Sequence, residues 1–214
     1  IPKCFDKDTI LLMNDGTNKK IKDICVGDIL ENNNIVTATF ILGSDDVVMH
    51  NYNGTIVSGC HSVLHKEQIK FVKDCPQTVK LDTYDSPFIY CLNTSKKIIK
   101  VGEVVYLDWD ELYGPMLDKI INYKIPCIDI GVKHNTHIHK FLDGGFEENT
   151  PIIMHDFSTK KIKDVKINDI LLNGEKVYGL VNIKGDDLFD VNKYNLGRNN
   201  CIKCGPNLNM LIDN

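Results

Sequence analysis

The sequence predicts an all-β protein, and three observations lead to this fold class. Short segments rich in Val, Ile, Thr and Tyr recur along the chain, at 35–42, 46–51, 55–57, 98–107 and 175–183. Clusters of Asn, Gly and Asp separate these segments and are typical of turns. The opening stretch, itself a strand-and-turn pattern, occurs a second time near residue 150. Only residues 108–123 have helical spacing, with Leu112, Met116 and Ile120 four positions apart.

Length and composition are those of a globular protein with an ordinary core. The chain has 214 residues, of which 43% are hydrophobic and 25% charged. The net charge of −4 argues against a nucleic-acid-binding protein. No apolar run approaches the roughly 20 residues of a membrane-spanning helix, so we expect none. Eight scattered cysteines favour reduced thiols, and with them an intracellular location. We expect a monomer without a cofactor.

The repeat divides the chain into two units. Residues 5–30 align without gaps on residues 146–171, and 12 of the 26 aligned positions are identical. A strand, an Asp-led turn and a second apolar stretch are present in both copies. We therefore expect one unit at residues 1–140 and a second, appended β unit at 141–214, with the boundary near a Gly pair at 144–145.

The two copies differ at positions that matter for chemistry. Cys4 aligns with Gly145, so the second copy lacks a thiol at that position. Phe157 and Asn168 replace two turn glycines of the first copy, which predicts relaxed turns in the second. We therefore expect both copies to adopt the same local fold, and at most the first copy to carry out chemistry.

The segment that begins at Cys4 carries a resemblance to a known family. Cys4 precedes a polar clip and a short apolar strand, followed by an Asp-Gly turn and a run that ends in Val26-Gly27-Asp28. This pattern resembles the first block of the Hint family, the self-processing domains of inteins and hedgehog proteins. The resemblance implies a pseudo-symmetric β fold in which Cys4 attacks the peptide bond before it. Lys3 would supply the scissile carbonyl.

A second motif follows a short β-branched strand, in the order Ser58-Gly59-Cys60-His61. It resembles the second Hint block, Thr-x-x-His, with Ser58 retaining the hydroxyl. The resemblance implies that Ser58 polarises the Lys3–Cys4 bond and that His61 protonates its nitrogen, which an N-to-S acyl shift requires. The alternative interpretations are a buried thiol at Cys4, a structural histidine at His61 and a strand-end hydroxyl at Ser58 that caps its own backbone.

Downstream segments extend the resemblance. A Tyr90-Cys91-Leu92 strand, a hairpin and an acidic exit at residues 108–111 resemble the Hint branch found beside von Willebrand A domains. The acidic exit could also be a metal or carboxylate site, but acids in the first turn of a helix are the better interpretation.

Histidines near residue 134 allow two interpretations. A strand followed by His134-Asn135 resembles the late intein block, in which such a histidine assists cleavage. His134, His137 and His139 also suggest zinc, but they have no matched second ligand group, and Cys201 with Cys204 makes only half a zinc site. We therefore expect no metal.

The last residue bears on whether such a domain splices or only cleaves. Inteins end in an Asn that cyclises, and Asn214 is preceded by Asp213 where a His is usual. The expected reaction is therefore cleavage without splicing, with a covalently attached upstream protein segment as the partner. The alternatives are a protein-splicing intein and a catalytically decayed Hint fold that acts as a structural or interaction module.

Overall fold

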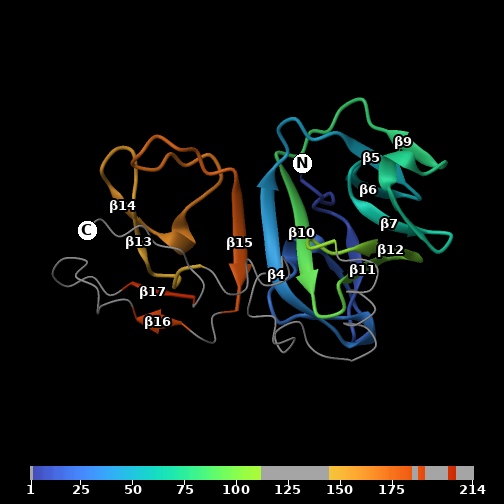
Figure 1. Ribbon diagram of the computed structural model, residues 1–214, viewed down its shortest axis with the longest axis horizontal. Helices are drawn as coiled ribbons and strands as arrows, with labels where there is room; N and C mark the ends of the chain where they lie inside the picture. Colours follow the sequence, from blue (N-terminus) through green and yellow to red (C-terminus); the bar gives the residue numbers. More distant parts are fainter. Residues whose placement is uncertain (1, 112–144, 185–187, 191–201, 206–214) are drawn as a thin grey trace.

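The computed structural model of the chain describes residues 2–111, 145–184, 188–190 and 202–205 (Figure 1). Within these ranges the regular elements are short strands and single 3-10 turns, which confirms the all-β class. The strands of the first unit are β1 (Ile10–Leu12), β2 (Asn18–Lys20), β3 (Ile29–Leu30), β4 (Asn34–Gly43), β5 (Met49–Tyr52), β6 (Thr55–Ser58), β7 (Ser62–His65), β8 (Gln68–Phe71), β9 (Thr78–Lys80), β10 (Phe88–Thr94), β11 (Ile98–Val101) and β12 (Val104–Leu107). Its 3-10 turns are η1 (Ile21–Asp23), η2 (Glu31–Asn33) and η3 (Val72–Asp74).

The second unit contains a smaller set of the same kinds of element. They are β13 (Pro151–Ile153), β14 (Thr159–Lys161), η5 (Ile162–Asp164), β15 (Gly179–Ile183), β16 (Phe189–Asp190) and β17 (Lys203–Cys204). The helix expected at 108–123 lies largely outside the described residues. Its first four residues form a turn rather than a helix.

Two larger sheets organise the first unit. One contains β10, β4 and, from the second unit, β15 in that order, with β3 also paired to β4; the other contains β11, β12, β7 and β8. A further group, β6-β5-β9, lies beside the first sheet, because Phe5 bridges Val57 of β6 on one side and Tyr90 of β10 on the other. The segment around Phe5 is therefore paired on both of its edges.

The hydrophobic core lies in the first unit. Strand β1 shows the alternation that creates it, since Leu11 is buried whereas Ile10 and Leu12 are exposed. Aromatic side chains fill the centre, with Phe5, Phe40 and Tyr106 nearly inaccessible to solvent. Among the residues described in the second unit, the buried apolar side chains are Met154, Val165 and Cys204.

The repeated sequence adopts one repeated conformation. In the first copy the Ile21 amide donates to the Thr9 carbonyl at 2.8 Å, and in the second the Ile162 amide donates to Thr150 at the same distance. An ion pair recurs as well. Lys19 binds Asp28 at 2.7 Å in the first copy, and Lys160 binds Asp169 at 2.8 Å in the second.

The turns of the second copy are not relaxed, contrary to the expectation from its sequence. Phe157 has φ 63° and Asn168 has φ 76°, both in the left-handed region that Gly16 and Gly27 occupy in the first copy. Hydrogen bonds keep them there, because the Phe157 amide donates to the Met154 carbonyl at 3.0 Å and the Asn168 amide to the Val177 carbonyl at 2.7 Å.

The two copies meet through equivalent strands. Strand β15 pairs antiparallel with β4, so that Gly179 lies opposite Leu42, Val181 opposite Phe40 and Ile183 opposite Ala38. After the 141-residue offset, Val181 is the counterpart of Phe40 itself. The paired strands are therefore related by a local two-fold axis through these two residues, as in an isologous interface between subunits.

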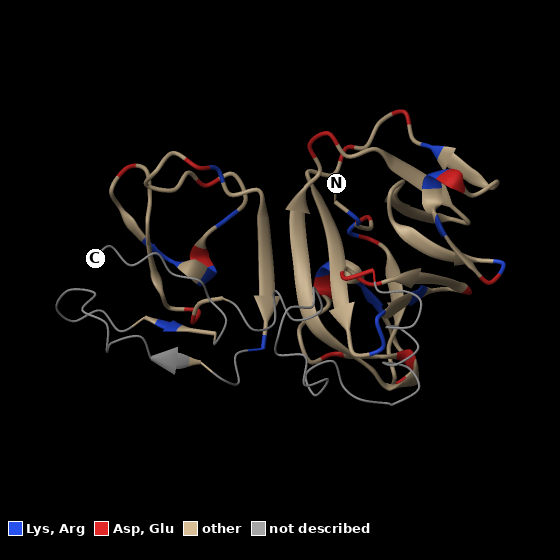
Figure 2. Ribbon diagram, in the orientation of Figure 1, with Lys and Arg blue, Asp and Glu red and all other residues tan. Residues whose placement is uncertain are grey.

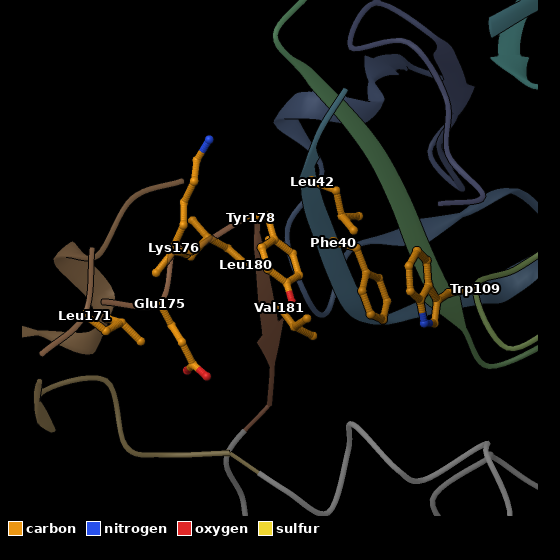
Figure 3. Close-up of a pocket in the computed structure, with 11 residues that line it drawn as sticks. Phe40, Leu42, Trp109, Leu171, Glu175, Lys176, Tyr178, Leu180 and Val181 are labelled. Carbon is orange, nitrogen blue, oxygen red and sulfur yellow. The ribbon is translucent and has the colours of Figure 1, made fainter. Parts of the chain in front are cut away.

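An apolar groove of about 550 Å³ lies where the copies meet (Figure 3). The first copy contributes Phe40, whose ring stacks on Trp109 with centroids 4.5 Å apart, and the second contributes Tyr178, Leu180 and Val181. Basic and acidic residues are interspersed on both units (Figure 2). In the described part of the chain no helix is long and apolar enough to cross a membrane.

Candidate functional site

The expected scissile bond lies inside a sheet. Residues 4–6 run between β6 and β10 and are hydrogen bonded on both sides. The Phe5 amide donates to the Tyr90 carbonyl at 2.7 Å, and the Tyr90 amide donates back at 2.9 Å. On the other edge, the Ser58 amide donates to the Cys4 carbonyl at 2.8 Å. These bonds hold Cys4 completely out of solvent.

Ser58 contacts the nitrogen of the expected scissile bond. The Cys4 amide donates to the Ser58 hydroxyl oxygen at 3.0 Å, although the two residues are 54 positions apart. In a regular ladder this donor would bind a backbone carbonyl, so the side chain replaces one ladder hydrogen bond. Ser58 is also fully buried. The alternative interpretation of Ser58, as a hydroxyl that caps its own backbone, does not describe this contact.

His61 lies in an aromatic box beside the same bond. Its ring centroid is 4.5 Å from that of Phe5 and 5.7 Å from that of Tyr106. One ring nitrogen, Nε2, lies 2.8 Å from the Leu107 carbonyl oxygen. A carbonyl only accepts, so Nε2 carries the proton and Nδ1 of the neutral ring is unprotonated. Nδ1 is buried and makes no hydrogen bond.

Burial sets the charge of His61. The ring is inaccessible to solvent, and desolvation lowers its pKa from 6.5 to about 4. The backbone carbonyls of Leu107 and Lys3 act in the opposite direction, as does the Glu111 carboxylate. The Lys3 carbonyl thus belongs to the electrostatic environment of the His61 ring. At neutral pH His61 is an uncharged imidazole with a vacant proton acceptor.

Lys3 is held by a residue far along the chain. Its ammonium forms an ion pair with the Glu111 carboxylate, whose other oxygen accepts a hydrogen bond from the Ser62 amide at 2.9 Å. The Glu111 side chain is only 8% exposed, so solvent screens the pair less than at an open surface. Glu111 thereby fixes the residue before Cys4 to the start of β7, one position after His61.

A second thiol approaches the same segment. Cys60 is partly buried, and its Sγ lies 3.2 Å from the Pro2 carbonyl oxygen and 3.9 Å from the Ser58 hydroxyl. Two residues therefore hold the segment before Cys4. Cys60 contacts the Pro2 carbonyl, and Glu111 forms an ion pair with Lys3.

Within the described residues, the acidic exit at 108–111 forms a turn that carries a buried charge cluster. The side chains of Asp108 and Asp110 are buried, and both pair with the buried Lys97, at 3.5 and 2.6 Å. Asp108 also accepts a hydrogen bond from the Thr94 amide at 2.9 Å. Desolvation raises the pKa of Asp108 to about 6, while Lys97 opposes that shift. This cluster anchors the β10–β11 turn to the end of β12 and so places Glu111 and the Leu107 carbonyl.

The second copy keeps the backbone frame of the site without its side chains. The Gly205 amide donates to the Gly145 carbonyl at 3.0 Å, as the Ser58 amide does to Cys4. Gly145 and Gly205 therefore replace Cys4 and Ser58. In the described part of the second copy, the Cys4 thiol and the Ser58 hydroxyl are thus both absent.

The structure brings together Lys3, Cys4, Ser58 and His61. Sequence reasoning missed Glu111, the Leu107 carbonyl and the position of Cys91 on the strand beside Cys4. His134, His137, His139, Cys201 and Asn214 lie outside the described residues. Across 2–111 and the described parts of the second unit, no group of three or more His, Cys, Asp or Glu side chains is arranged to hold a metal ion. No protein-family model matches the chain, and no curated protein matches it either.

Proposed function

We propose that the chain cleaves the Lys3–Cys4 peptide bond autocatalytically, as a Hint-type domain. The observation that carries the proposal is the convergence of Ser58 and His61 on this one bond, from positions more than 50 residues away. The Ser58 hydroxyl accepts a hydrogen bond from the Cys4 amide nitrogen, and the Lys3 carbonyl opposes the lowering of the His61 pKa by burial. The described part of the second copy has glycines in place of Cys4 and Ser58 and still keeps the equivalent backbone hydrogen bond, which supports a role for these two side chains beyond folding.

The proposed chemistry is an N-to-S acyl shift. The Cys4 sulfur attacks the Lys3 carbonyl carbon, and the thiol proton moves to the vacant Nδ1 of His61. The carbon–nitrogen bond then breaks, and the same proton passes from His61 to the departing Cys4 nitrogen, which becomes a free amine. An imidazolium whose pKa is about 4 is a strong acid for this second transfer. The product is a thioester between Lys3 and the Cys4 sulfur.

The fixed geometry makes the attack intramolecular. Strand pairing on both edges of residues 4–6 and the Glu111 ion pair on Lys3 immobilise the two reacting residues. Holding reacting groups in this way replaces an encounter between molecules with a unimolecular step. Water or another nucleophile then resolves the thioester and releases the upstream segment.

A second internal likeness supports a pseudo-symmetric Hint-type fold. Within the first unit, β7, β8 and η3 follow one another as β1, β2 and η1 do. The Val72 amide donates to the His61 carbonyl at 2.9 Å, as the Ile21 amide does to Thr9 at 2.8 Å. His61 thus takes the place of Thr9 in the second of these units.

A fusion with a folded protein placed before Ile1 tests the proposal. We expect dithiothreitol to release the partner and hydroxylamine to leave a hydroxamate at its new C-terminus, both seen by intact mass. Cys4→Ala is expected to abolish release, whereas Cys25→Ala, which changes an exposed cysteine of the same copy, retains it. Equal release from Cys4→Ala and the parent would sink the proposal.

The same assay separates the alternatives. A product in which both flanking segments are joined would identify a splicing intein. A decayed fold with a structural or interaction role would give a different result: the fusion would show parent-like fluorescence from Trp109, and so be folded, but would release no partner.

A further inference from the structure

Cys4 and Cys91 are direct cross-strand neighbours. Phe5 and Tyr90 exchange both of their backbone hydrogen bonds, at 2.7 and 2.9 Å, which makes them a hydrogen-bonded pair of an antiparallel ladder. Such pairs alternate with non-hydrogen-bonded pairs, so the next pair in this register is Cys4 with Cys91. Strand β10 keeps a regular register through Cys91, and its irregularity comes later, between Asn93 and Thr94.

This register suits a disulfide. Residues of a non-hydrogen-bonded pair have Cα atoms about 4.5 Å apart and side chains on the same face. Disulfide-bonded cysteines have Cα separations of roughly 4.4–6.8 Å, so the backbone need not move far to form the bond. On its other edge Cys4 lies opposite Ser58, and within the described ranges the register therefore offers Cys4 only Cys91 as a thiol partner.

The thiols also contact each other. Both side chains are fully buried. Desolvation raises the pKa of Cys91 well above its usual range, and the neighbouring Cys4 thiol raises it further through a side-chain hydrogen bond. Cys60, the other thiol near this segment, binds the Pro2 carbonyl instead.

We propose that Cys4 and Cys91 are a disulfide-forming pair that a small-molecule disulfide such as oxidised glutathione can close. The two thiols lose two protons and two electrons and form one sulfur–sulfur bond, while one oxidised glutathione accepts them and becomes two reduced molecules. The consequence for activity rests on the proposed function. The bond occupies the sulfur that attacks Lys3, so the oxidised chain cannot form the thioester until a reductant opens it.

Non-reducing peptide mapping of the full chain tests the pair. Folded protein is incubated with oxidised glutathione, and a second sample is refolded from urea in a glutathione redox buffer so that burial does not limit access. We expect a linked peptide carrying Cys4 and Cys91, lighter by two hydrogens than its reduced components. It should be absent from Cys91→Ala and present in Cys25→Ala. A Cys4–Cys60 linkage, or a Cys4 that stays free to alkylation in both samples, would overturn the proposal.

The mapping reads mass and not cleavage, so the two proposals can fail separately. A linked peptide from a chain whose reduced fusion releases nothing would leave the thiol pair standing and overturn the cleavage. If the reduced fusion releases its partner but no linked peptide forms, the cleavage proposal stands and the thiol pair is overturned. If both hold, we expect oxidised fusion to lose release completely and to regain it with dithiothreitol but not with hydroxylamine alone.

Discussion

Acidification is expected to destabilise the fold through His61. The ring is buried as the neutral form with a pKa of about 4, whereas in the unfolded chain the value is near 6.5. Above pH 6.5 neither state binds the proton. As the pH falls from 6.5 towards 4, the unfolded chain takes up a proton that the folded chain excludes, so stability is lost with falling pH. The difference in pKa corresponds to a loss of about 3 kcal/mol by pH 4.

Urea unfolding at pH 7 and pH 4 measures this loss. Trp109, the single tryptophan, reports folding because it stacks on Phe40. We expect the free energy of unfolding of the parent to fall by about 3 kcal/mol more than that of His61→Gln over this range. Asp108 acts with the opposite sign, because its raised pKa of about 6 means that protonation favours the folded state. Because Asp108 is present in both the parent and His61→Gln, its contribution largely cancels in the difference between them.

Parallel pH dependence of the parent and His61→Gln would refute the reasoning. Should the variant not fold, NMR titration of the His61 ring in the parent provides the same test. A ring that titrates at its ordinary pKa near 6.5 would contradict the burial argument, whereas a ring that stays neutral down to about pH 4 supports it.

Three further substitutions test packing and backbone strain. Lys97→Met leaves two buried aspartates without their cation, and we expect urea titration to show a loss of about 3–5 kcal/mol, against little change for the more exposed Lys100→Met. Gly59→Ala places a methyl group 2.3 Å from the His50 ring, which should cost about 1–3 kcal/mol and slow the proposed cleavage by displacing the Ser58–His61 turn. Phe157→Gly relieves a left-handed residue that is 82% exposed, so we expect a gain of about 0.5–1 kcal/mol.

Each of these substitutions has an internal control. His50→Ala in the Gly59→Ala background removes the clashing ring, so the double variant should recover stability relative to Gly59→Ala. The reverse of the Phe157 substitution, Gly16→Phe in the first copy, should destabilise. Equal effects of Lys97→Met and Lys100→Met would contradict the argument from the buried charge cluster.

Local pattern predicted a large part of the candidate site. Cys4, Ser58 and His61 were grouped by motif and order; the structure brings Ser58 to the Cys4 amide, and the Lys3 carbonyl counteracts the lowering of the His61 pKa by burial. The partners of these residues escaped prediction for a physical reason. The acceptor for His61 is the backbone carbonyl of Leu107, and every residue has such a group. The partner of Glu111 also escaped prediction, because an acid in an acidic run carries no sign of the distant lysine that it binds.

The sequence by itself determined the all-β class and the duplication, because side-chain alternation and turn residues act over a few neighbouring positions. It also determined that the second copy lacks the Cys4 thiol. Only the tertiary structure decided that β15 pairs with its own counterpart β4, that Gly205 stands in for Ser58, and that Cys4 faces Cys91. Strand order and register depend on which apolar faces can be buried together across the whole chain, and no local segment contains that information.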